Sequence, residues 1–171
     1  MSKDIRKMID KVKNYNQFVN ENSVDTNNVN NLILLYVNNG FSSENIIDIR
    51  KEGYFNGIEW LDENTLIVYR SISLPESKVT GFKKSISGGI GQYWSYNKNI
   101  DPIWGGNAEY EADKNENIIN IRCKGYLKLQ DIDFEDLLYA FNDDFHHFCD
   151  EQEIRGRQSG DTIKVKECFI I

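Results

Sequence analysis

Three short segments of this chain carry side chains that could do chemistry together. Arg70 ends an apolar, β-branched run, Ser95 lies within an aromatic segment, and Glu151 and Glu153 stand two positions apart. A guanidinium fits phosphate oxygens, aromatic rings around a small hydroxyl fit a flat heterocycle, and carboxylates stabilise developing positive charge. The order Arg, aromatic-Ser, Glu-x-Glu predicts a site that holds a pyrophosphate and works on a sugar.

Arg70 needs an anionic partner if it lies on a buried strand, because an unpaired buried charge is costly. It follows four apolar or aromatic residues, a run typical of a buried strand. Its planar fork suits a phosphate or a carboxylate. The partner is therefore either a ligand phosphate or one of the 27 acidic residues of the chain in a structural ion pair.

The segment around Ser95 has two interpretations. Tyr93, Trp94 and Tyr96 either surround a flat ligand or pack inward as a core strand. A glycine-rich run ends at Gly91 and would let backbone approach a ligand closely. This run is neither Gly-x-Gly-x-x-Gly between a strand and a helix nor a Gly-Lys-Ser/Thr motif, which excludes Rossmann and P-loop sites.

Glu151 and Glu153 would point the same way on a strand, because side chains alternate between its faces. One carboxylate could then stabilise positive charge on a sugar while the other handles an incoming nucleophile. The alternative is a pair of solvated surface carboxylates.

The histidines and cysteines predict neither a metal site nor a disulfide framework. His146 and His147 are adjacent, so on a helix they would point about 100° apart and make poor joint ligands. Cys123, Cys149 and Cys168 form no spaced pattern, and their odd number fits a reducing compartment.

Composition limits the class of protein. The chain has 171 residues, 40% hydrophobic and 27% charged, which predicts one globular domain. Its net charge of −7 disfavours sequence-independent nucleic-acid binding and allows either a basic partner or imitation of nucleic acid. No signal-peptide or membrane-spanning pattern is present in the sequence, so we expect a cytoplasmic protein, with delivery into a host cell left open.

Hydrophobic periodicity predicts an α+β fold, with a helical part at residues 1–55 and a core at residues 56–171. The expected helices are residues 3–20, 29–37, 42–53, 107–112 and 134–149. The expected strands are residues 58–60, 65–72 and 117–129, with a hairpin of residues 151–157 and 161–171 around the turn 158–160.

Together, Tyr69-Arg70, Trp94-Ser95-Tyr96 and Glu151-Gln152-Glu153 resemble the motifs of the Arg–Ser–Glu class of mono-ADP-ribosyltransferases, in its single-domain bacterial or phage type. In that family an Arg ends an early strand, a Ser-Thr-Ser-like segment follows, and Glu-x-Glu or Gln-x-Glu precedes a late strand. The resemblance covers residues 58–171. This chain departs from the family where Tyr96-Asn97 replaces Thr-Ser, and where residues 154–157 are more polar than the usual apolar strand.

The resemblance implies a core split into two small sheets, with NAD as the substrate in the cleft between them. Arg70 would pair with the pyrophosphate, an aromatic side chain would pack near nicotinamide, and Ser95 would support Glu153 by a hydrogen bond. The implied NAD-binding residues are Arg70, Gly91, Tyr93, Trp94, Ser95 and Tyr96.

The resemblance also implies the catalytic residues. Glu153 would hold the ribose 2′-hydroxyl and stabilise the oxocarbenium ion as nicotinamide leaves. Glu151 would orient or deprotonate the acceptor, and in this family a Glu at that position accompanies arginine acceptors. The expected partners are NAD and a protein target, which the acidic surface would attract if it is basic; we expect neither a nucleic-acid nor a membrane partner.

Two other functions stay open. An NAD glycohydrolase would use the same residues with water as the acceptor. A non-enzymatic acidic protein, such as an inhibitor or a nucleic-acid mimic, would need carboxylates spread over one face, whereas basic residues are interspersed throughout this chain.

Overall fold

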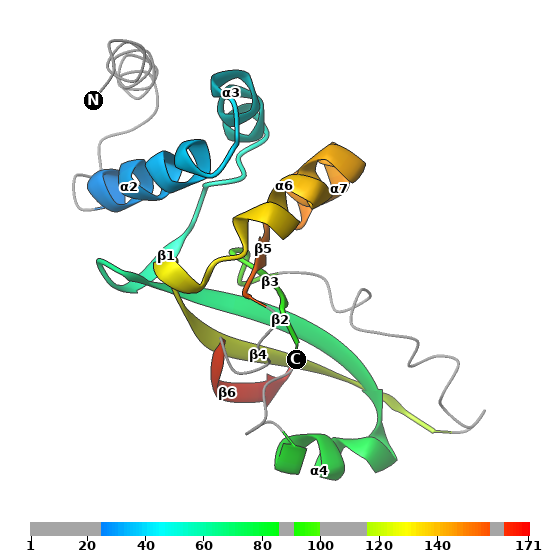
Figure 1. Cartoon of the computed structure of the whole chain (residues 1–171). Helices are drawn as coiled ribbons and strands as arrows, with labels where there is room; N and C mark the ends of the chain where they lie inside the picture. The colour runs from blue at the N-terminus through cyan, green and yellow to red at the C-terminus, as the bar shows by residue number, and fades with distance from the viewer. Residues whose placement is uncertain (1–24, 86–90, 100–115, 158–162) are drawn as a thin grey trace. The chain divides into compact units, whose positions relative to one another are not determined.

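The computed structural model describes residues 25–85, 91–99, 116–157 and 163–171, and these form helices and an antiparallel sheet (Figure 1). The chain divides into two compact units, residues 1–48 and 49–171. The helices expected at residues 3–20 and 107–112 lie outside the described residues. No helix in the described part of the chain is both long and apolar enough to cross a membrane.

A glycine and a pair of polar residues mark the boundaries of the first two described helices. Helix α2 spans Asp25–Asn38, and its C-terminal turn leads into Gly40, whose φ of 108° favours glycine. Helix α3 spans Ser43–Lys51, and Ser42 and Asn45 exchange hydrogen bonds of 2.9 and 3.1 Å at its start. Both helices were predicted at these positions.

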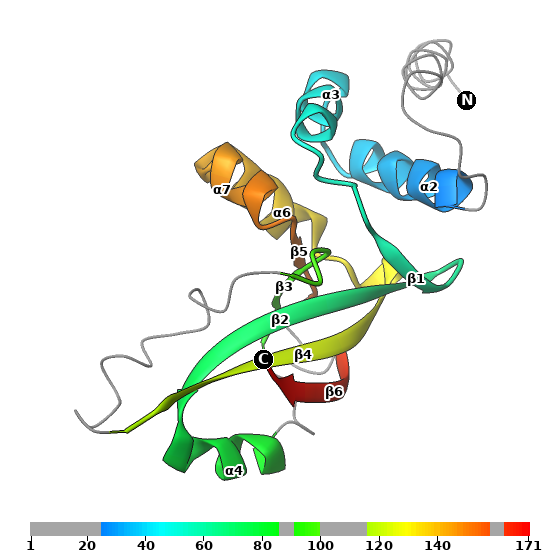
Figure 2. The same ribbon diagram turned by 180° about the vertical axis from the view of Figure 1, so that it is seen from behind.

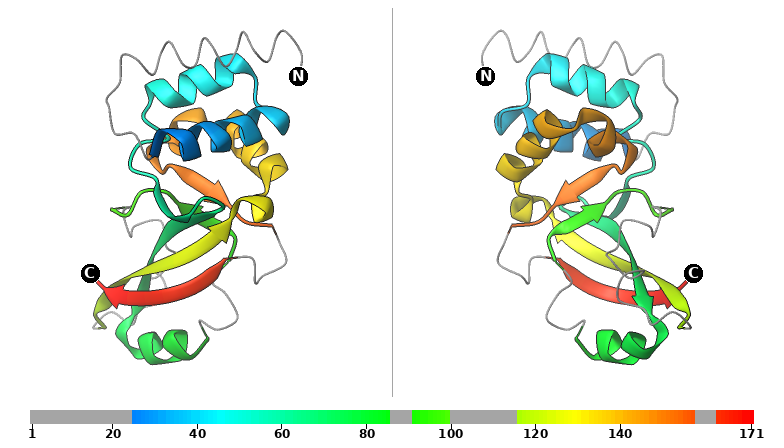
Figure 3. Two further views of the ribbon diagram at one scale, coloured as in Figure 1. Left: turned by 90° about the vertical axis from the view of Figure 1, so that its left-hand side faces the viewer. Right: turned by 90° about the vertical axis from the view of Figure 1, so that its right-hand side faces the viewer.

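The described residues of the second unit form six antiparallel strands, in the order β5-β3-β2-β4-β6 with β1 beside β2 (Figures 1 and 2). The longest ladder joins β2 and β4 from Thr65↔Lys128 to Pro75↔Ile118, and β6 runs beside β4 (Figure 3). The strands are β1 Glu59–Asp62, β2 Thr65–Pro75, β3 Tyr93–Ser95, β4 Ile118–Lys128, β5 Glu153–Arg155 and β6 Lys164–Ile170.

Strands β2 and β3 share fewer paired residues than any other two neighbouring strands of the described sheet. Strand β4 occupies one edge of β2, and β1 and β3 share the other edge. The β2–β3 contact has a single register pair, Tyr69↔Ser95, whereas β3 and β5 share three pairs. The described strands thus form one continuous sheet, and not the two small sheets that the resemblance implied; β3 and β5 form a short ribbon that pairs with β2 at one position.

One face of the sheet carries the core. Along β4, from Ile121 to Leu127, the residues on this face are buried and the intervening ones are more exposed, whereas β2 also buries Thr65, Tyr69 and Ser71 on its other face. The Trp94 ring packs over Gly125, where a Cβ would lie 3.0 Å from the ring. The buried residues of the two strands on this face are Leu66, Val68, Ile72, Ile121, Cys123 and Leu127.

Two short helices precede β5. Helix α6 spans Phe134–Asp143 and α7 spans Phe145–Asp150, in agreement with the predicted helix pair. Asp133 caps α6 and Asp144 caps α7. Helix α4, Glu76–Ser85, follows β2 and was not predicted, and a 3-10 turn, Leu129–Asp131, follows β4.

The predicted hairpin is wrong. Strand β5 pairs with β3 and β6 pairs with β4, so the two lie toward opposite ends of the strand order. A turn-forming segment shows where the chain can reverse, but burial decides the partner. Ile154 is fully buried in β5, and Cys123 and Cys168 lie opposite each other in β4 and β6.

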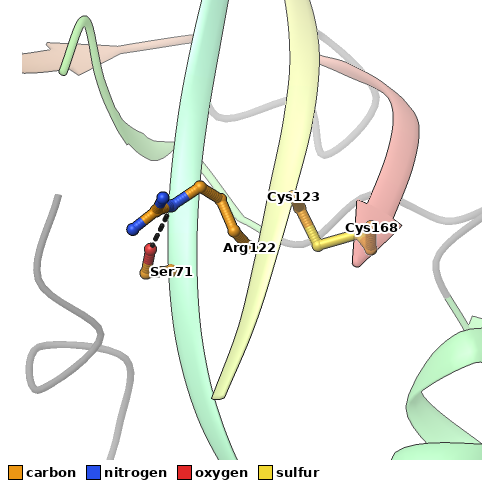
Figure 4. Close-up of a disulfide and its surroundings, with 4 residues drawn as sticks. All are labelled: Ser71, Arg122, Cys123 and Cys168. Carbon is orange, nitrogen blue, oxygen red and sulfur yellow. Dashed lines mark hydrogen bonds between the residues drawn. A yellow bond between two sulfur atoms is a disulfide. The ribbon is translucent and has the colours of Figure 1, made fainter. Parts of the chain in front are cut away.

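The cysteine prediction also requires correction. Cys123 and Cys168 form a disulfide across β4 and β6, and Cys149 is a buried free thiol (Figure 4). The two bonded residues are 45 positions apart, so spacing along the sequence did not suggest the pair. Such disulfides are typical of oxidising compartments, so the bond does not fit the reducing compartment that the odd cysteine number suggested.

Candidate active site

Ser95 and Glu153 are register partners on β3 and β5, and Ser95 also pairs with Tyr69 on β2. Directly opposed residues of antiparallel strands point to the same face, so these three side chains form a row. Arg70 is the residue after Tyr69. The Arg, Ser and Glu segments that the sequence singled out therefore lie on three adjacent strands.

Glu153 is held in a buried polar cluster. The residue is 8% exposed, and its Oε1 atom accepts a 2.7 Å hydrogen bond from Nε of Arg155. Arg155 also contacts Asp136 of α6, with 2.9 Å between Nη1 and Oδ2. The backbone carbonyl of Glu153 accepts a hydrogen bond from the Tyr54 hydroxyl. These contacts fix both the main chain and the side chain of Glu153.

The Ser95 hydroxyl does not make the bond that the resemblance implied. It donates to the backbone carbonyl of Glu151 and accepts from the Asn97 amide at 2.8 Å. The carbonyl of Glu151 reaches Ser95 because the chain turns between α7 and β5. Ser95 therefore supports Glu153 through the backbone of the Glu-x-Glu segment and not through the Glu153 carboxylate.

Glu151 is not on a strand, which corrects the expectation that both carboxylates alternate along one. It is the C-cap of α7, and Oε1 lies 3.4 Å from Nε2 of His147 one turn earlier. Burial raises the pKa of Glu151, His147 opposes this, and the charge of Glu153 raises it further. The two carboxylates therefore influence each other although they belong to different elements.

Gln152 makes the turn that separates the two glutamates. Its φ is 47°, in the left-handed region. Its side-chain amide lies within hydrogen-bond distance of the carbonyl oxygens of Gly53, Tyr54 and Asn56, at 3.1, 2.9 and 2.9 Å. Nothing in the composition of the Glu-x-Glu motif indicates that Gln152 makes these contacts.

Arg70 packs where β2 and β3 separate. Alternation along β2 places its side chain on the opposite face from Tyr69, and a Cβ on Gly91 would lie 2.5 Å from its Nη1 atom. Gly91 has a φ of 97°, so glycine is needed both for this conformation and for this contact. Burial lowers the pKa of Arg70 and Tyr93 opposes the shift, but a guanidinium remains charged at neutral pH.

The aromatic residues around Ser95 divide into core and surface. Trp94 and Tyr96 are buried, and the Tyr96 ring lies 5.5 Å from that of Tyr54. Tyr93 is 48% exposed, and the Arg155 guanidinium lies 4.6 Å from its ring centroid. Of these three rings, Tyr93 is the one that could contact a ligand.

No protein-family model, curated protein or solved structure matches the chain.

Proposed function

We propose that this protein is a mono-ADP-ribosyltransferase that transfers ADP-ribose from NAD to a protein side chain. The observation that carries the proposal is the register pair Ser95↔Glu153, on strands next to the strand of Arg70. Segments from three separate parts of the sequence lie on adjacent strands in the order that the resemblance to this family requires, with the Arg70 side chain on the opposite face from Ser95 and Glu153. The burial of Glu153 distinguishes it from a solvated surface carboxylate.

Glu153 is proposed to stabilise the transition state. The bond between ribose C1′ and the nicotinamide nitrogen breaks, and its electron pair leaves with nicotinamide. Positive charge develops on the ribose ring, and a buried carboxylate opposes it more strongly than a solvated one would. Glu153 accepts no hydrogen bond at Oε2 from any described residue, so that oxygen is available for the ribose 2′-hydroxyl.

Two further side chains are proposed to bind NAD. Arg70 would bind the pyrophosphate from its position beside Gly91, where its planar fork can pair with two phosphate oxygens. Tyr93 would pack against the nicotinamide ring, because its own ring is half exposed.

Glu151 is proposed to act on the acceptor, which we expect to be an arginine. The acceptor nitrogen forms the new bond to C1′ and loses a proton, and a carboxylate with a raised pKa is a better base for that proton. The target is proposed to be a basic protein, since the chain carries a net charge of −7.

The test is incubation of the protein with NAD labelled at the adenylate phosphate, together with a cell lysate. Transfer predicts labelled protein bands and release of nicotinamide, both lost in Glu153→Gln. Glu135→Gln on α6 is the matched control, because Glu135 is exposed. Nicotinamide release without labelled protein would make the activity hydrolytic. No consumption of NAD would refute the proposal and favour the acidic binding protein.

A further inference from the structure

Arg155 contacts Glu153, Asp136 and Tyr93 at once. Its Nε donates to Oε1 of Glu153 at 2.7 Å, and its Nη1 lies 2.9 Å from Oδ2 of Asp136. Nη1 also lies 3.4 Å from the Asp136 carbonyl, and the guanidinium covers one face of Tyr93. The Arg155 side chain is only 14% exposed.

We propose that Arg155 is a positioning residue that sets the Glu153 carboxylate for the glycosyl bond cleavage. This inference rests on the proposed function. Arg155 lies two residues after Glu153 on β5, so both side chains project from the same face of the strand. The resemblance to the transferase family assigns no role to this position; it marks residues 154–157 only as unusually polar.

The guanidinium can hold Glu153 in one orientation because it is itself fixed on a second element. Asp136 lies in the first turn of α6 and also accepts a 3.3 Å hydrogen bond from Nε2 of Gln92. The contacts run from Gln92 before β3, through Asp136 on α6, to Arg155 and Glu153 on β5. Because the planar guanidinium of Arg155 contacts Glu153 on one side and Asp136 on the other, the Glu153 carboxylate has little rotational freedom.

The contact with Arg155 also determines which oxygen of the Glu153 carboxylate is available to the ribose. Arg155 occupies Oε1, and Oε2 has no donor among the residues that the structure describes. A carboxylate oriented in advance loses no free energy to reorientation during the reaction. The same cation offsets the cost of burying the carboxylate, so Glu153 can be both buried and charged.

The proposal differs from a purely structural ion pair in its kinetic consequence. A structural pair would affect the free energy of unfolding and leave kcat unchanged in protein that remains folded. A positioning residue should lower kcat by about 10- to 100-fold, the range expected when a reacting group is misplaced by about an ångström. The KM for NAD should change little, because Arg155 does not bind NAD in this proposal.

The test measures nicotinamide release by the full chain and by Arg155→Lys, which keeps the charge but cannot hold Glu153 and Asp136 together. We expect a reduced kcat with KM within about twofold. Arg157→Lys is the matched control, because Arg157 is exposed and lies just beyond β5. If Arg155→Lys does not fold, Asp136→Asn replaces it and should lower kcat in the same direction.

A double-mutant cycle then separates action through Glu153 from any other effect. In a Glu153→Gln background, Arg155→Lys should cost nothing further, because the group that it positions is gone. Two outcomes with an active wild type would overturn this inference and leave the proposed function in place. One is an unchanged kcat in Arg155→Lys; the other is that Arg155→Lys lowers kcat equally in the wild-type and Glu153→Gln backgrounds. A wild type that releases no nicotinamide would overturn both.

Discussion

Glu151 closes helix α7 and Glu153 begins strand β5, so the two carboxylates belong to different elements although one residue separates them. The Gln152 turn gives each a different environment: Glu153 contacts Arg155, and Glu151 contacts His147. Two acidic groups with different partners can have different roles in one reaction.

Replacing Glu153 should remove catalysis and also cost some stability. Glu153→Gln keeps the volume and removes the charge, so nicotinamide release should fall by about 10²-fold or more. The variant also leaves Arg155 with Asp136 as its remaining carboxylate, which should lower the free energy of unfolding by about 1–3 kcal/mol. The measurements are single-turnover kinetics and urea denaturation. Full activity in folded Glu153→Gln would rule out the proposed mechanism.

Glu151 should separate transfer from hydrolysis. Glu151→Gln should reduce labelling of an arginine-bearing target much more than it reduces nicotinamide release, because Glu151 is proposed to act only on the acceptor. Both rates are measured on one preparation. An equal fall in target labelling and nicotinamide release would mean that Glu151 acts on NAD. If neither rate falls, Glu151 has no role in the reaction.

The raised pKa of Glu151 gives a pH dependence with a defined sign. Only the ionised carboxylate can accept a proton, and burial raises its pKa. The transfer rate should therefore decline as pH falls, starting above the ordinary glutamate pKa of about 4.3. His147 lies 3.4 Å away and opposes the rise in the pKa of Glu151, so His147→Gln should raise that pKa further. An acidic limb that persists in Glu151→Gln would assign the titration to another group.

Much of the fold could be predicted because local signals and burial agree. The β-branched run before Arg70 predicted β2, and the Asn-Asn-Gly sequence at Gly40 predicted the end of α2. Helix α4 was missed because its ten residues contain few apolar side chains, chiefly Val79 and Phe82, which give little periodicity. The pairing of strands and the disulfide depend on which side chains from distant parts of the sequence pack together, and short sequence patterns do not show this.

Contacts within the candidate site were only partly predictable from the sequence. The resemblance led us to expect Ser95 close to Glu153, and the two are register partners on β3 and β5. The direction of the Ser95 hydroxyl depends on the Gln152 turn, which places the Glu151 carbonyl beside it. The role proposed for Arg155 depends on its contact with Asp136, which lies 19 positions earlier in the sequence, on α6.

Gly91 should be required for the position of Arg70. An Ala Cβ would lie 2.5 Å from Nη1 of Arg70, at a φ of 97° that L residues rarely adopt. Gly91→Ala should weaken NAD affinity in titration calorimetry, and Arg70→Lys should weaken it too because the bidentate fork is lost. Gly57→Ala is the matched control, since Gly57 has a φ of 70° and no heavy atom within 4 Å of the added Cβ. If neither Gly91→Ala nor Arg70→Lys changes the affinity for NAD, Arg70 has a structural role and does not bind NAD.

The disulfide between Cys123 and Cys168 should contribute to stability. It closes a loop with a sequence separation of 45, and loops of this size stabilise folded domains by about 2–4 kcal/mol, chiefly by restricting the unfolded chain. Cys168→Ser should therefore unfold at lower urea concentration than the wild type, and wild type in reductant should behave like the variant. Cys149→Ala is the comparison, because Cys149 is a buried free thiol and its removal should leave the response to reductant intact. Thiol labelling of the denatured wild type under non-reducing conditions should modify Cys149 alone; labelling of Cys123 and Cys168 as well would contradict the bond.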